Sequence, residues 1–239
     1  MDRLTRRELK QDQLRTTFEE FEQFAKTHYR EIVTVMSALI VILGLAAGLK
    51  LYNDRQDASA NADLGAALKT FRAYVGNATP EMLGADSPTF PTAQAKYKKA
   101  LEQFSEVARR FPHQKAAAIA RCHVGVCQAA LGDHAAAIKT LEEASRTSDQ
   151  NIAALAKFAL AGECASGGKL ADAEKLYQDL ANHPTLTVPK AAALLALADA
   201  DRAAKPAQSR KIYQDLEKEF GSDAALVADI KEQMSGLSK

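Results

Sequence analysis

The stretch "GDHAAAIKTLEEA", residues 132–144, places a glycine and an aspartate before a run of helix-forming residues with three consecutive alanines. Alanine is the best helix former, so these alanines suit an ordinary surface helix. They are also small enough to let a second helix pack closely against them. If packing is the reason for them, the same pattern should recur along the chain.

The pattern recurs four times without gaps, at 97–112, 134–149, 170–185 and 206–221, in steps of 37, 36 and 36 residues. Each copy has a small residue, a large apolar residue four positions later and a third apolar residue three positions after that. The small residues are Ala100, Ala137, Ala173 and Ser209, the large ones Phe104, Leu141, Tyr177 and Tyr213, and the third set Val107, Ala144, Leu180 and Leu216. A period in the mid-thirties predicts stacked helix-turn-helix units, because one helix pair cannot bury its apolar face alone. Gly132 and Gly168 precede the second helix of a pair, where a turn with positive φ is expected.

Two copies, 118–149 and 154–185, carry these residues together with Gly125 and Ala161, and they resemble the tetratricopeptide repeat family. Val107, Leu180 and Leu216 depart from the family pattern, which usually has alanine there. The resemblance implies an all-α solenoid in which the first helix of each pair lines a concave protein-binding surface. The matching positions form an apolar row of Ile119, Cys122, Val126, Leu155, Phe158, Leu194 and Ala198. The row predicts either a groove for an apolar helix or unfolded segment, or a groove filled by helix 54–75 or by the insert 76–91.

The two ends of the repeat region depart from this regular spacing. The first unit has a predicted helix over 62–75, and the insert 76–91, rich in proline and glycine, is predicted to be a loop before the helix at 97–112. Residues 223–237 predict a last helix that caps the stack. The composition, with few β-branched runs outside one segment, predicts essentially no sheet.

An uncharged run of 18 residues, 32–49, predicts one transmembrane helix. At 1.5 Å per residue it covers about 27 Å, close to the roughly 30 Å hydrocarbon core of a bilayer. The sequence thus predicts an N-terminal segment 1–31, a transmembrane helix 32–51 and a repeat domain 52–239. Within 1–31, Leu14, Phe18, Phe21 and Ala25 form one apolar face, which predicts either an amphipathic helix on a membrane or partner subunit, or a charged extension of the span.

The expected location is a bacterial inner membrane, crossed once. Seven Lys and Arg precede the span, although the balance close to the membrane is nearly even. The positive-inside rule therefore gives mild support for a cytoplasmic N-terminus and a periplasmic repeat domain.

Little in the sequence points to chemistry. A net charge of +1 gives no indication of nucleic-acid binding, and no phosphate loop, nucleophile elbow or His-Glu-x-x-His motif is present. His123 and Cys127 share a helix face but supply only two of the ligands that a zinc site needs. The sequence thus predicts no enzyme, metal, cofactor or small-molecule substrate. The three cysteines are expected to be buried free thiols, with a Cys127–Cys164 bridge as the alternative.

The order of parts over the whole chain resembles the single-span family of ancillary subunits of the SecYEG translocon. That resemblance implies an adaptor that hands newly exported proteins to chaperones, with the translocon, chaperones or a membrane complex as partners. The alternative is a structural or accessory subunit of a larger membrane complex. The expectation is thus a membrane-anchored, non-catalytic scaffold for protein–protein interaction.

Overall fold

The computed structural model of the chain describes residues 27–76 and 88–236. Its contacts divide the chain into two compact units, Met1–Arg55 and Gln56–Lys239. Helix α2, Tyr29–Phe71, begins in the first unit and continues into the second. The amphipathic helix predicted within 1–31 lies almost entirely outside the described residues.

The described part of the first unit is the N-terminal portion of α2. This helix is long and apolar enough to cross a membrane, and nothing in the structure buries its apolar window. The exposed side chains there include Val35, Leu39, Ile42 and Leu45. Such a surface is stable in hydrocarbon, because a helix satisfies its own backbone hydrogen bonds.

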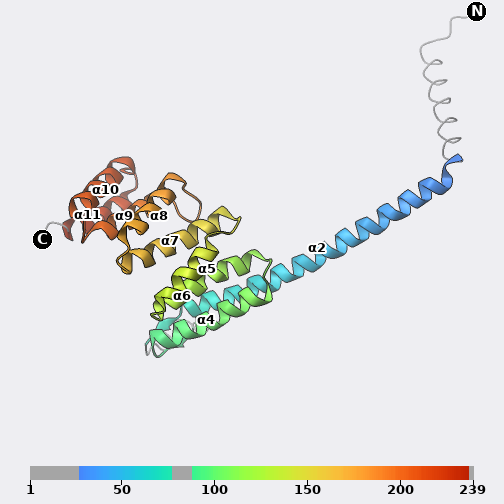
Figure 1. Cartoon of the computed structure of the whole chain (residues 1–239), viewed down its shortest axis with the longest axis horizontal. Coiled ribbons are helices and arrows are strands. Elements are labelled where there is room, and N and C mark those ends of the chain that lie inside the picture. Colours follow the sequence, from blue (N-terminus) through green and yellow to red (C-terminus); the bar gives the residue numbers. More distant parts are fainter. Residues whose placement is uncertain (1–26, 77–87, 237–239) are drawn as a thin grey trace, which may run out of the picture. The chain divides into compact units, whose positions relative to one another are not determined.

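The second unit is built from helices that pack in consecutive pairs (Figure 1). After the end of α2 they are α4 Ala93–Arg110, α5 Lys115–Ala130, α6 His134–Ala144, α7 Gln150–Ser166, α8 Leu170–Asn182, α9 Lys190–Asp201, α10 Pro206–Glu219 and α11 Ala224–Ser235. Each helix from α4 to α10 contacts the next, and α5 also contacts α7, as α7 contacts α9. The four predicted second helices thus correspond to α4, α6, α8 and α10, and α11 packs on α10 as expected of a last helix.

Polar N-cap side chains and glycines in turns set several of the helix boundaries. Thr92 Oγ1 accepts a hydrogen bond from Ala95 N at 3.1 Å, and Asp133 Oδ1 accepts one from Ala136 N at 3.1 Å, which satisfies backbone donors at the starts of α4 and α6. Gly132 and Gly168 have φ of +87° and +77°, so the expected positive φ at both turns is confirmed.

The repeated positions form the core of the second unit. All twelve residues at the small, large and third positions are at most 5% exposed. They belong mainly to three clusters, one between α2, α4 and α5, one across α6 to α9, and one between α9, α10 and α11. In the opening stretch, burial confirms a packing role for Ala137 and Ala144, whereas Ala135 is exposed and Ala136 is only partly buried.

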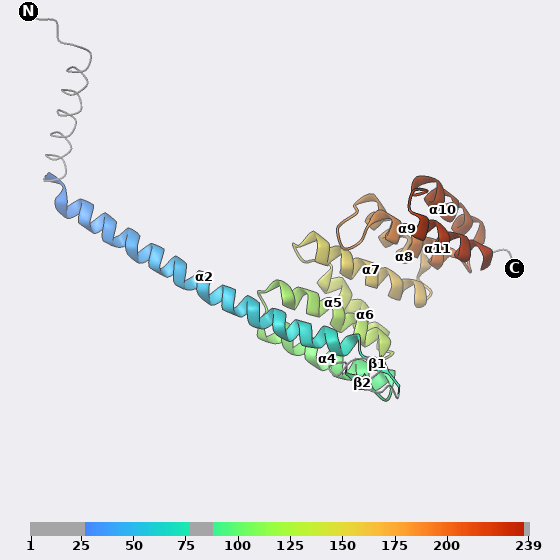
Figure 2. The same cartoon turned by 180° about the vertical axis from the view of Figure 1, so that it is seen from behind.

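The prediction of essentially no sheet is wrong in one place. Strands β1, Tyr74–Val75, and β2, Thr89–Phe90, pair in parallel, with Tyr74 opposite Thr89. Figure 2 shows them beside the start of α4, and β2 contacts that helix. β1 lies just before the predicted insert 76–91 and β2 lies within its last residues, so the insert is not entirely a loop as predicted. Residues 77–87 of the insert lie outside the described part of the chain. Because Tyr74 and Val75 are extended, the first helix ends at Phe71 and not at residue 75 as predicted.

Candidate functional site

The first helices of successive pairs, α5, α7 and α9, contact one another and carry the predicted apolar row. Two members of that row lie inside the core. Cys122 is 2% exposed, with its Sγ 3.9 Å from Ile152 O, and Ala198 is 0% exposed. In this structure, neither side chain is accessible to a partner.

Four other members of the row are partly buried. Ile119 packs against the cluster between α2, α4 and α5, and Leu194 packs against the clusters around α9. The Phe158 ring meets the Tyr177 ring edge-on, with centroids 5.5 Å apart. Leu155 is also partly buried. The row is therefore largely a seam between helices, and it is not one continuous open groove.

The remaining member, Val126, lies at a hollow between α5, α6 and α7, which we call the α5–α7 hollow. Its volume is about 390 Å³. It is lined by Val126, Ala129, Ala130, Leu141, Ala159, Gly162, Glu163 and Ser166. Most of these side chains are small and apolar, so the hollow has the size and character to accept a larger apolar side chain.

One ion pair contributes polar groups to the α5–α7 hollow. Glu163 Oε2 lies 2.9 Å from Nδ1 of His134, the first residue of α6. Glu163 is mostly buried while His134 is exposed, so the pair joins α6 to α7 at the edge of an otherwise apolar surface.

The end of α2 packs beside the hollow but does not line it. Ala60, Leu64 and Ala67 of α2 join the cluster with α4 and α5, and the Phe71 ring lies 5.2 Å from the His123 ring. The lining of the hollow comes only from α5, α6 and α7 among the described residues. Filling by helix 54–75 is therefore not observed here, and most of the insert 76–91 lies outside the described residues.

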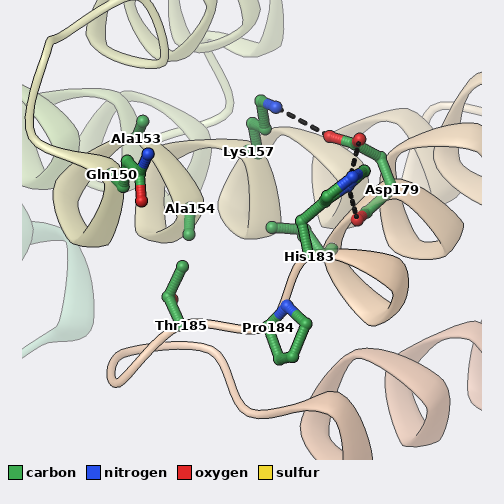
Figure 3. A pocket seen from close by; sticks show the side chains of 9 residues that line it. Gln150, Ala153, Ala154, Lys157, Asp179, His183, Pro184 and Thr185 are labelled. Carbon is green, nitrogen blue, oxygen red and sulfur yellow. Dashed lines mark hydrogen bonds and ion pairs between the residues drawn. The ribbon is translucent and has the colours of Figure 1, made fainter.

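A second hollow, of about 340 Å³, lies between α7, α8 and the loop before α9 (Figure 3). Lys157 Nζ is 2.7 Å from Asp179 Oδ2, and His183 Nδ1 is 3.1 Å from Asp179 Oδ1. These two partners hold the pKa of the Asp179 carboxyl below its usual value, with the Lys157 hydrogen bond as the largest cause. This hollow was not predicted from the sequence, because Lys157 is far from Asp179 along the chain.

The loop beside this second hollow is held in place by Asn151 of α7. Asn151 Oδ1 accepts a hydrogen bond from Leu186 N at 3.2 Å, and its carbonyl oxygen accepts one from Thr187 Oγ1 at 2.6 Å. The Leu186 side chain is nevertheless 93% exposed. The loop therefore presents an apolar side chain on an ordered backbone.

His123 and the cysteines, which were considered as metal ligands or as partners in a disulfide, pack inside the helix stack. His123 stacks on Phe104 with ring centroids 4.8 Å apart, and burial lowers the pKa of His123. No group of three or more His, Cys, Asp or Glu side chains suited to a metal occurs within residues 27–76 and 88–236. The three cysteines are free and buried, as the sequence predicts, and burial raises the pKa of Cys122 to about 11 and of Cys127 to about 12.

Comparison of the chain with known protein families, with curated proteins and with solved structures gave no match.

Proposed function

We propose that the chain is a membrane-anchored, non-catalytic scaffold that binds other proteins, with the α5–α7 hollow as one contact site. The observation that supports this proposal is the hollow itself, an apolar concavity lined by small side chains on two adjacent first helices. Burying a Leu or Phe side chain contributes about 1.5–3 kcal/mol, so a concavity of this kind favours a partner that offers such a residue. The apolar part of α2 supplies the anchor.

The favoured partners are exported polypeptides, with the chain acting as an adaptor beside a translocon or a chaperone. The adaptor role is supported by the order of segments in the sequence, in which an apolar helix precedes a stack of helix pairs. A non-native or helical segment of a client offers the exposed apolar side chains that the hollow accommodates.

A structural subunit of a larger membrane complex is the second candidate, and one feature of α2 favours it. Gly44 and Gly48 lie four residues apart within the apolar stretch, and no atom that could meet a side chain at either position lies within 4 Å. Small residues with this spacing allow close packing of a second membrane helix. A fixed stoichiometry that survives detergent and salt would favour the subunit over the adaptor.

Photocrosslinking tests the contact site. A benzoylphenylalanine at Ala130, an exposed residue that lines the hollow, is expected to form adducts with a partner protein, and one at the exposed Gln178 of α8 is the control position. Gly162→Leu places a side chain in the hollow and also improves the helix propensity of α7. Because the partner's apolar side chain can then no longer enter the hollow, the Ala130 adducts should fall by about tenfold. Equal adducts at the two positions, or adducts unchanged by Gly162→Leu, would contradict the proposal.

Labelling tests the orientation. Ser222→Cys places an exposed thiol between α10 and α11, whereas the three native cysteines are buried. With a periplasmic domain, a membrane-impermeant maleimide added to intact spheroplasts should label this variant, and the unsubstituted chain should stay unlabelled. Labelling only after lysis would place the helix pairs in the cytoplasm and remove the adaptor role in export.

A further inference from the structure

A buried carboxylate lies where α8, α9 and α10 meet. Asp201, the last residue of α9, is 0% exposed, and neither of its carboxylate oxygens has a hydrogen-bond partner that can donate in its ionised state among the described residues. An ionised carboxylate in such a place is costly, because burial removes water without supplying a donor. The usual outcome is that the group keeps its proton.

The group that faces Asp201 from α8 is a second carboxyl, that of Glu174. Burial, followed by a side-chain hydrogen bond with Glu174, raises the pKa of Asp201. The pKa of Glu174 is lowered mainly by its hydrogen bond to Lys205, and to a smaller degree by the one to Asp201. Two carboxyl groups form such a bond only when one of them carries a proton. The arrangement is therefore that of a carboxylic acid that donates to a neighbouring carboxylate.

Two further side chains lie near the Asp201 carboxyl, those of Lys205, the residue before α10, and Gln208 of α10. Lys205 Nζ bonds Glu174 Oε1, and Lys205 N donates to the carbonyl oxygen of Asp201 at 2.7 Å. The Lys205 ammonium thus stabilises the Glu174 carboxylate in preference to Asp201. Gln208 is the weakest influence and favours the ionised form of Asp201, but its amide does not reach either carboxylate oxygen with hydrogen-bond geometry.

The other charged groups near this end of α9 form hydrogen bonds and ion pairs that do not include the Asp201 carboxyl. Asp199 accepts a hydrogen bond from Tyr213 Oη, and Arg202 lies 3.3 Å from both Asp199 Oδ1 and Tyr213 Oη. Arg202 also donates to Gln233 of α11. These contacts join α9 to α10 and α11 but supply no donor to the Asp201 carboxyl.

We infer that the proton shared by Asp201 and Glu174 is a pH-sensitive lock that holds α10 and α11 against α8 and α9. When the proton leaves, two carboxylates face each other in a buried place, and a single lysine compensates them. The α8–α9–α10 junction then loosens, so that water can reach Asp201.

The direction of the pH effect follows from the pKa of Asp201, which burial and Glu174 raise from 3.8 to about 6. The folded junction holds the proton more tightly than the unfolded chain does. Its contribution to stability is therefore full below about pH 3.8, declines above that value, and is lost once pH has risen through about 6.

Hydrogen–deuterium exchange of the full chain in uncharged lipid nanodiscs tests this lock at about pH 5 and about pH 7.5, on either side of the folded pKa. Each exchange rate is divided by the intrinsic rate at the same pH. Protection of α10 and α11 is expected to fall by about tenfold between the two pH values, since pH 5 lies one unit below the folded pKa of about 6 and one pKa unit corresponds to tenfold.

The variant that removes the lock is Asp201→Asn, which keeps the shape but has no proton to lose. It should give α10 and α11 the same protection at both pH values. Asp215→Asn, at an exposed position of α10, is the matched control and should behave like the unsubstituted chain. Glu174→Gln offers an amide that can donate a hydrogen bond to ionised Asp201. Because ionised Asp201 is then stabilised, the difference in protection of α10 and α11 between the two pH values should become smaller. A pH effect that persists in Asp201→Asn and Glu174→Gln, or none in the unsubstituted chain, would overturn the inference.

Discussion

Replacing Phe104 with alanine is expected to lower the free energy of unfolding of the helix stack by about 3–5 kcal/mol, as is typical for removing a fully buried Phe. The Phe104 side chain is fully buried in the cluster between α2, α4 and α5. Its ring contacts those of Phe71 and His123, at centroid distances of 6.1 Å and 4.8 Å. The substitution therefore leaves a cavity where three helices meet.

Urea unfolding of the full chain in lipid nanodiscs, followed by circular dichroism, measures this effect. Leu186→Ala is the control, because it removes an exposed apolar side chain and should change stability by less than about 0.5 kcal/mol. A Phe104→Ala chain as stable as the control would show that α2 does not pack on α4 and α5 in solution.

The second large effect is expected at Gly125 of α5. A Cβ atom there would lie 2.6 Å from Leu141 Cγ and 2.8 Å from Leu141 Cδ2, closer than carbon atoms can approach. Gly125→Ala is therefore expected to destabilise the stack by about 1–3 kcal/mol, although alanine improves helix propensity by about 1 kcal/mol. Leu141→Ala alone should cost about 2–5 kcal/mol through the cavity it leaves.

The double variant Gly125→Ala/Leu141→Ala distinguishes overpacking from other causes. Removing the Leu141 side chain also removes the clash, so the double variant should be less destabilised than the sum of the two single variants. Gly162→Ala on α7 is the matched control: its new Cβ would meet Tyr177 Oη at an ordinary 3.6 Å, so a slight stabilisation is expected. Additive effects of Gly125→Ala and Leu141→Ala would contradict the close approach of α5 and α6.

The helix pairs could be predicted from the sequence because the packing positions recur. A small residue such as Ala137 and a large one such as Leu141 repeat at a nearly constant period, and a helix places residues four apart on one face. The paired strands could not be predicted in this way. Two-residue strands are too short to show alternation, and the pairing of Tyr74 with Thr89 joins a residue before the insert to one near its end.

The candidate site was predicted only in part. Cys122 and Val126 are one turn apart on α5, yet one is in the core and the other lines the hollow. Which of two residues one turn apart is covered depends on where the neighbouring helices pack, and sequence spacing does not determine that position. The rest of the lining is mainly alanine and glycine, whose significance depends on the space around them and not on their chemistry.

The buried, weakly acidic thiols have a consequence for how the protein matures. Disulfide exchange requires a thiolate that an oxidant or an isomerase can reach, and Cys122 and Cys127 offer neither once the helices have packed. Cys164 is also free and buried, and its pKa is raised, so the folded helix pairs contain no disulfide for oxidative folding machinery to form. The cysteines are open to oxidation only before the helices pack. At that stage an oxidant could form a disulfide that the folded stack does not contain.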